Sequence, residues 1–163
     1  MGRTSARFLP GAAAAVLMFS CCALAQSLQV VRADGGATTL TAEQIAALPH
    51  VSIKVSDHDT PAQFDGVPLS AVLKLAGAEI SGPMKGPQLT EALLVEAADG
   101  YKVVFALAEL DPDFATREIL LADRRDGKPL DSKQGPFRVI APGDKRPARW
   151  VRQVTGLRIV AVH

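Results

Sequence analysis

Short runs in which apolar and polar residues alternate recur along the chain and are typical of half-buried β-strands. The clearest run is 51–56, VSIKVS, in which valine and isoleucine alternate with serine and lysine. Asp-Gly pairs at 99–100 and 126–127 predict tight turns between such runs. The same reasoning predicts further strands at 28–32, 93–97, 101–105, 118–122, 137–141 and 157–162.

Helical patterns are confined to short segments. Thr41, with Gln44 three residues later, gives a capping-box pattern for a helix over 41–47. A second helix is expected after Pro68, ending at Gly77, with a buried stripe formed by Leu69, Val72, Leu73 and Ala76.

Three shorter segments complete the prediction: a loop over 57–62, one helical turn over 107–110 and a short helix over 148–153. Short strands interleaved with a few short helices predict an α+β domain with a mixed β-sheet.

The first 25 residues have the features of an export signal. Arg3 and Arg7 precede an apolar run over 8–24, and Ala23-Leu24-Ala25 has the small-x-small pattern of a cleavage site. The run is too short and too rich in alanine for a membrane span, which takes about 20 strongly apolar residues. We therefore expect a cleaved signal peptide at 1–25 and one periplasmic domain at 26–163, with no transmembrane segment after cleavage.

Cysteine usage and charge exclude several classes of function. Cys21 and Cys22 both lie in the expected leader, so the mature chain has no disulfide and no thiolate metal ligand. It carries 16 basic and 17 acidic residues, a formal net charge of −1. A balance this close to neutral gives no general attraction to nucleic acids or anionic membranes. The function must therefore come from a local site.

Several short motifs follow one another in the order seen in a known family. They are Phe64-Asp65-Gly66-Val67-Pro68-Leu69, Asp99-Gly100-Tyr101, Ile119-Leu120-Leu121-Ala122, Asp126-Gly127-Lys128-Pro129-Leu130, Gly135-Pro136-Phe137-Arg138-Val139 and Arg149-Trp150-Val151. Together they resemble the oxidoreductase molybdopterin-binding domain of the sulfite oxidase type, over about residues 40–162. The resemblance implies a sulfite oxidase-like fold, a molybdopterin cofactor and oxidoreductase activity.

The chain departs from that pattern where the metal would bind. The resemblance implies a molybdenum-ligating cysteine near the end of the strand before Gly66, but the stretch Val55-Ser56-Asp57-His58-Asp59 has no sulfur. A carboxylate is a poor substitute for a soft thiolate ligand. The leader also lacks the paired arginines that accompany folded, cofactor-loaded enzymes of this family, and an unfolded exported chain carries no assembled cofactor site. We therefore expect no bound cofactor.

Asp57, His58 and Asp59 form the only cluster of metal-type ligands in the mature chain, and they are candidates for a metal or proton-transfer role. If the strand continues through them, Asp57 and Asp59 face one way and His58 the other. The alternative is a solvated loop with an Asx turn and no such role.

A basic concentration near the C-terminus is the second candidate site; it comprises Arg138, Lys145, Arg146, Arg149 and Arg152. On the expected helix over 148–153, Arg146, Arg149 and Arg152 would share a face able to hold a phosphate or carboxylate. The resemblance implies that this segment lines the pterin pocket. The alternative is a surface whose charges pair with Asp131, Asp144 or solvent.

Two aromatic residues accompany these candidates. Trp150 and Tyr101 either line the same cleft or pack structurally.

Three functions from different classes therefore stay open. The preferred one is a cofactor-free periplasmic module that binds a small anionic ligand or a partner protein. The others are a molybdopterin-dependent oxidoreductase with an altered ligand shell, and an accessory subunit of a membrane sensor or enzyme.

Overall fold

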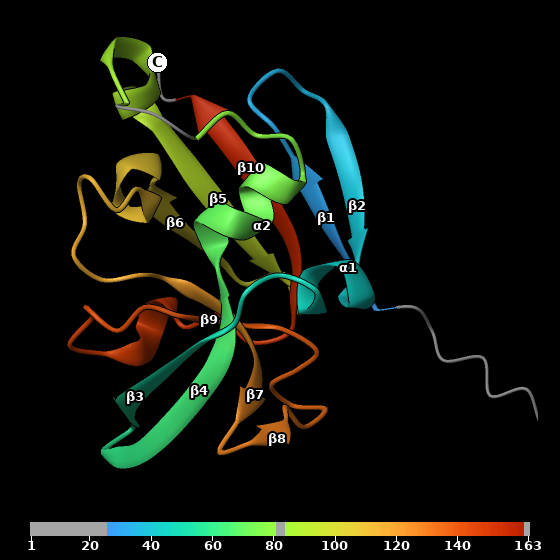
Figure 1. The fold of residues 1–163 in the computed structure, drawn as a ribbon, viewed down its shortest axis with the longest axis vertical. Coiled ribbons are helices and arrows are strands. Elements are labelled where there is room, and N and C mark those ends of the chain that lie inside the picture. Colours follow the sequence, from blue (N-terminus) through green and yellow to red (C-terminus); the bar gives the residue numbers. More distant parts are fainter. Residues whose placement is uncertain (1–25, 81–83, 162–163) are drawn as a thin grey trace, which may run out of the picture.

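The computed structural model describes residues 26–80 and 84–161, so the expected leader lies outside the described residues (Figure 1). Two five-stranded β-sheets carry the fold. In the first sheet β1 pairs in parallel with β10, and the other neighbours are antiparallel. Its order is β2 (Ala37–Thr41), β1 (Ser27–Val31), β10 (Val154–Ala161), β5 (Glu91–Ala97) and β6 (Lys102–Ala106).

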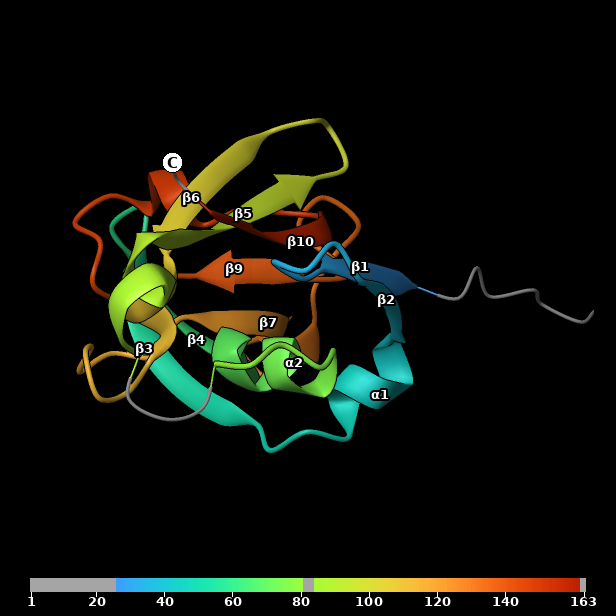
Figure 2. The ribbon, with the colours of Figure 1, turned by 90° about the horizontal axis from the view of Figure 1, so that it is seen from above.

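The second sheet is antiparallel and positions the candidate site. Its order is β3 (Val51–Asp57), β4 (Thr60–Pro68), β7 (Leu120–Arg125) and β8 (Lys128–Pro129), and β9 (Arg138–Ile140) also pairs with β7. Within the described part of the chain β3 pairs with β4 alone, which makes β3 an edge strand. Figure 2 shows the layers from above, with β9 between β10 and β7.

The helices are short. They are α1 (Ala42–Ala46) and α2 (Leu69–Leu75), with 3₁₀ turns η1 (Gly86–Thr90), η2 (Leu107–Leu110) and η3 (Pro147–Arg149). The predicted capping box at Thr41 is present, since Gln44 N donates to Thr41 Oγ1 and Thr41 N donates to Gln44 Oε1. Of the helices in residues 26–80 and 84–161, none is long and apolar enough to cross a membrane.

One continuous apolar core fills the space between the sheets and beneath α2. The predicted stripe of α2 is buried, with Leu69, Val72 and Leu73 all at 0% exposure. Gly66 marks a bulge where β4 meets β7. A Cβ there would collide with the backbone of Ala122, so the close approach of these strands requires glycine.

The α+β class with mixed sheet pairing is confirmed, but two local predictions were wrong and the bounds of one predicted strand differ. Residues 60–62 belong to β4 because His58 and Asp59, at φ 51° and 65°, reverse the chain in a two-residue turn. The strand expected at 118–122 begins at Leu120 and continues to Arg125.

The helix expected over 148–153 is also absent. Only η3 forms there, because the carbonyl of Val151 accepts a hydrogen bond from Val139 N (2.8 Å) and Gln153 has φ 50°. The backbone of this segment therefore pairs with β9 instead of coiling, and the shared helical face expected for Arg146, Arg149 and Arg152 does not exist.

Candidate functional site

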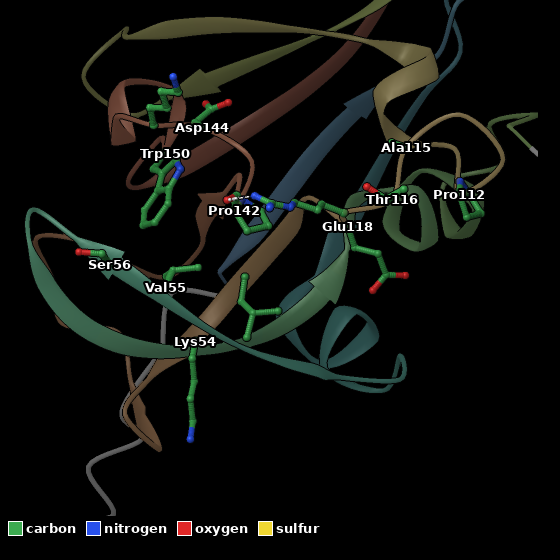
Figure 3. A pocket seen from close by; sticks show the side chains of 13 residues that line it. Lys54, Val55, Ser56, Pro112, Ala115, Thr116, Glu118, Pro142, Asp144 and Trp150 are labelled. Atoms are coloured by element: carbon green, nitrogen blue, oxygen red, sulfur yellow. Dashed lines mark hydrogen bonds between the residues drawn. The ribbon is translucent and has the colours of Figure 1, made fainter.

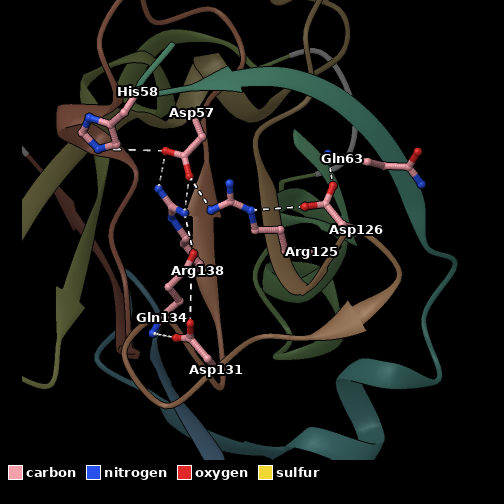
Figure 4. Close-up of polar contacts among 8 residues, drawn as sticks. All are labelled: Asp57, His58, Gln63, Arg125, Asp126, Asp131, Gln134 and Arg138. Atoms are coloured by element: carbon pink, nitrogen blue, oxygen red, sulfur yellow. Dashed lines mark hydrogen bonds and ion pairs between the residues drawn. The ribbon is translucent and has the colours of Figure 1, made fainter. Parts of the chain in front are cut away.

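Asp57 lies at the end of β3 and forms a buried ion cluster with two arginines (Figure 4). Arg138 donates from Nη1 to Asp57 Oδ2 and from Nη2 to Oδ1, both at 3.0 Å. Arg125 Nη1 donates to the same Oδ2 at 3.0 Å. Asp57 is 5% exposed and Arg138 is 1% exposed, so this is an internal pair of the kind in which every charge must be compensated.

The guanidinium of Arg138 is enclosed on all sides. Gln134 Oε1 accepts a 2.7 Å hydrogen bond from Nη1, and the rings of Phe64 and Trp150 have their centroids 5.2 and 5.7 Å from Cζ. Nε alone has no partner among the described atoms. Arg138, predicted as an anion-binding residue, therefore lies inside the domain with its charge already paired.

The cluster keeps Asp57 ionised. Burial would raise the pKa of Asp57, but the hydrogen bond from Arg138 and the charges of Arg138, Arg125 and His58 outweigh it and hold the pKa below the ordinary 3.8. A carboxylate with such a low pKa is a poor general acid or base near pH 7. Its two oxygens already accept three charge-assisted hydrogen bonds.

The other two residues of the acidic-histidine cluster point elsewhere. His58 and Asp59 are exposed in the turn, and His58 Nε2 lies 3.9 Å from Asp57 Oδ1. Asp57 thus faces inwards while Asp59 faces solvent, which differs from the expected alternation because the chain turns between them. In residues 26–80 and 84–161 no group of three acidic, histidine or cysteine side chains could hold a metal.

The second candidate cluster divides into anchored and exposed residues. Arg149 donates to both oxygens of Asp144 at 2.6 and 2.9 Å, lies within 3.3 Å of Glu109 and covers the ring of Phe105 at 4.4 Å. The hydrogen bond with Asp144 raises the pKa of Arg149 above its ordinary value. Arg149 therefore holds its loop in place.

Lys145 and Arg146 are exposed in the same loop. No carboxylate of the described residues lies within 4.0 Å of either side chain. Tyr101 Oη donates to the carbonyl of Ala148 at 2.9 Å, and Trp150 Nε1 donates to that of Ala141 at 2.9 Å. Tyr101 and Trp150 therefore support the loop that presents the two cations.

A cleft of about 1070 Å³ opens between β3 and this loop (Figure 3). In Figure 3, Val55, Pro142 and Trp150 gather at its centre, while Lys54 points away from them. A smaller pocket of about 590 Å³ adjoins it at Ser56 and Lys145, which line both. The smaller pocket is completed by His58, Asp59, Arg146, Pro147 and Ala148.

Sequence reasoning missed several residues of this region. Arg125 and Gln134, which complete the ion cluster, carry no local signal, because their roles depend on the pairing of β4 with β7 and on the path of the chain before β9. The alternation at 51–56 identifies Lys54 and Ser56 only as the polar side of a strand. Among the described strands β3 pairs with β4 alone, which makes it an edge strand, and the sequence does not show which strands pair with one another.

Comparison with known proteins places this fold. No curated protein sequence matches the chain, but a family model described as the oxidoreductase molybdopterin binding domain matches residues 25–162. Among solved structures, the sulfane dehydrogenase SoxCD from Paracoccus pantotrophus is similar, with a TM-score of 0.63 and 19% sequence identity. That match covers 82% of this chain but only 38% of the SoxCD chain, and it concerns the fold alone. The chain belongs to the oxidoreductase molybdopterin-binding domain family.

Proposed function

We propose that this domain binds a small anionic ligand beside Lys145 and Arg146, and that it does so without molybdenum. The observation that carries the proposal is the state of Asp57. This residue stands in the stretch where the resemblance implies the metal-ligating cysteine, and both its oxygens are bound to arginines of the same chain.

The donor set does not fit molybdenum held by a pterin dithiolene. Residues 26–163 contain no cysteine, and a hard carboxylate is a poor ligand for this soft coordination. Freeing Asp57 for a metal would leave Arg138 buried without its counter-charge, which costs about 3–5 kcal/mol in comparable pairs. Membership of the family supports the alternative of a molybdopterin oxidoreductase, whereas the chemistry of Asp57 opposes it.

An anion fits the exposed side of the site. Lys145 and Arg146 bring two cations to the smaller pocket, against the single carboxylate of Asp59. Ser56 adds a hydroxyl there and His58 an imidazole. Arginine and lysine beside one another are suited to phosphate or carboxylate groups. The contacts of Arg149 and Tyr101 hold the loop before any ligand arrives, which lowers the entropic cost of binding.

The proposal includes a periplasmic location for the domain. A periplasmic site of action is supported by the leader-like sequence of residues 1–25, and export of an unfolded chain agrees with a domain that needs no cofactor insertion.

Calorimetric titration with pyrophosphate, a small probe of the phosphate class, tests the anion site. We expect binding that weakens about ten- to a hundredfold in the double variant Lys145→Ala/Arg146→Ala, since two charge-assisted contacts are lost. The matched control is Lys128→Ala/Lys133→Ala, which removes two exposed cations that lie outside the cleft. Equal affinities for both double variants would show that only general charge attracts the probe, and the proposed site would then be wrong.

A further inference from the structure

The edge of β3 that borders the cleft has unpaired backbone groups. In an antiparallel ladder, residues alternate between bonded and non-bonded pairs. The two-residue turn at His58 and Asp59 makes Asp57–Thr60 a bonded pair, so Val55, Ile53 and Val51 also bond to β4. The amides and carbonyls of Ser52, Lys54 and Ser56 therefore face away from β4.

These outward groups have no partner among the described residues, whether backbone or side chain. Each of the three residues contributes one donor and one acceptor. Pro61 stands opposite Ser56 at a non-bonded position, where its missing amide hydrogen costs the ladder nothing, and this confirms the alternation. β3 is thus a free edge with the hydrogen-bonding pattern that an additional strand requires.

We propose that an extended acidic peptide segment docks on this edge as an additional antiparallel strand and fills the cleft. The inference rests on the proposed anion site, since the acidic end of the segment beside Ser56 would reach Lys145, which lines both the cleft and the smaller pocket. Addition of a strand to an exposed sheet edge is a general mode of peptide recognition.

The two faces of the docked segment call for side chains of different chemistry. Residues that bond to Ser52, Lys54 and Ser56 have their side chains on the same face as those residues, away from the centre of the cleft. An acidic residue there is directly opposite Lys54. The alternate residues point into the cleft, where Val55, Pro142 and Trp150 form an apolar surface, so apolar side chains fit.

Charge favours an acidic partner over a second copy of this chain. The cleft is lined by Lys54, Arg117 and Lys145, against the carboxylates of Glu118 and Asp144, and Asp144 is already neutralised by Arg149 at 2.6 Å. Two copies pairing through β3 about its centre would place Lys54 opposite Lys54. Like charges in that position destabilise a strand pair.

Fluorescence anisotropy with a fluorescein-labelled seven-residue peptide of alternating glutamate and valine tests this. N-methylation of the glutamate amides removes the donors that face β3, and we expect at least about tenfold weaker binding because several hydrogen bonds are lost. N-methylation of the valine amides, which face solvent, leaves affinity within about twofold. Both analogues keep the side chains and charge of the parent peptide and are measured on the unaltered protein.

A pair of protein variants tests the same hydrogen bonds by altering the protein instead of the peptide. Ser56→Pro removes one outward amide hydrogen on an edge strand, where proline is tolerated, and should weaken the parent peptide about tenfold or more. Ser56→Ala, the control, also lacks the hydroxyl that lines the smaller pocket but keeps the amide donor, so it should bind the parent peptide about tenfold or more tightly than Ser56→Pro does.

The outcomes separate this inference from the proposed function. If all three peptides bind equally, or none binds, while pyrophosphate binding still depends on Lys145 and Arg146, strand addition is wrong and the anion site stands. If the methylated peptides differ as expected but pyrophosphate does not bind, the anion site fails and the docking edge stands. Dimers in sedimentation velocity that Ser56→Pro abolishes would show that a second copy occupies the edge, which overturns the peptide proposal.

Discussion

Asp57 and Arg138 are 81 positions apart in the sequence, yet they form a bidentate ion pair with both N–O distances at 3.0 Å. The pair joins the end of β3 to β9, which lies on the far side of β7 in the same sheet. Its carboxylate belongs to the stretch 55–59, in which the resemblance implies a metal-bound thiolate. Two expectations follow from this ion pair: the region loses stability when the pair is broken, and Asp57 is not free to bind a metal.

Asp57→Asn should destabilise the domain by about 3–5 kcal/mol, because it leaves the buried Arg138 without a counter-charge. Urea unfolding followed by circular dichroism measures this. Asp126→Asn makes the same chemical change at an exposed ion pair with Arg125 and should cost less than about 1 kcal/mol. Equal losses of unfolding free energy for the two variants would mean that the buried pair stabilises the domain no more than the exposed pair does.

Replacing both partners should cost less than removing one. In the double variant Asp57→Leu/Arg138→Met no buried charge is left unpaired, so the loss of stability should be smaller than for Asp57→Asn. The same urea titration decides this point. A double variant less stable than Asp57→Asn would show that packing, not charge, dominates the site.

The contribution of Asp57 to the stability of the protein should decrease in acid. Because the pKa of Asp57 is lower in the folded than in the unfolded state, the unfolded state takes up the proton first as pH falls. The contribution of Asp57 is therefore present above its unfolded pKa of about 3.9 and is lost as pH falls through the folded pKa. The difference in unfolding free energy between the unaltered protein and Asp57→Asn should shrink below about pH 4. A difference that is constant from pH 7 to pH 2.5 would contradict this assignment.

Tyr101→Phe should weaken pyrophosphate binding without unfolding the domain. The variant removes the hydrogen bond to the carbonyl of Ala148, worth about 0.5–1.5 kcal/mol, and so loosens the loop that presents Lys145 and Arg146. We expect a two- to tenfold loss of affinity in the calorimetric titration. Faster amide hydrogen exchange around residues 145–149 should accompany the loss. Unchanged affinity would show that Tyr101 does not support the anion site.

Export should remove residues 1–25. Intact mass spectrometry of the protein from the periplasm of its own host should give a chain that begins at Gln26. Ala25→Arg places a large charged residue at the cleavage position and should leave the leader attached. A full-length mass for the unaltered protein would contradict the expected cleavage.

Most of the fold could be predicted from the sequence, but little of the candidate site could. Alternation at 51–56 and the capping box at Thr41 are local signals, and they predicted β3 and α1 correctly. The helix expected at 148–153 failed because the carbonyl of Val151 pairs with β9, a contact between segments that local propensity does not report.

The candidate site shows the same limit. The sequence marks Asp57 as a candidate by its place in a motif and Arg138 by its charge, but nothing in their spacing indicates that they neutralise one another. Burial decides the role of Arg138, and burial follows from how β3, β4, β7 and β9 assemble. Lys145 and Arg146, by contrast, lie exposed on a loop, and their role in anion binding stays a prediction.

Molybdenum and pterin content, measured by elemental analysis and pterin fluorescence on protein purified from its own host, tests the central claim most directly. We expect far less than one molybdenum per chain and no pterin signal, because Asp57 is committed to Arg138 and Arg125 and residues 26–163 contain no cysteine. Molybdenum and pterin near one per chain would contradict the claim and make the domain a cofactor-loaded member of its family.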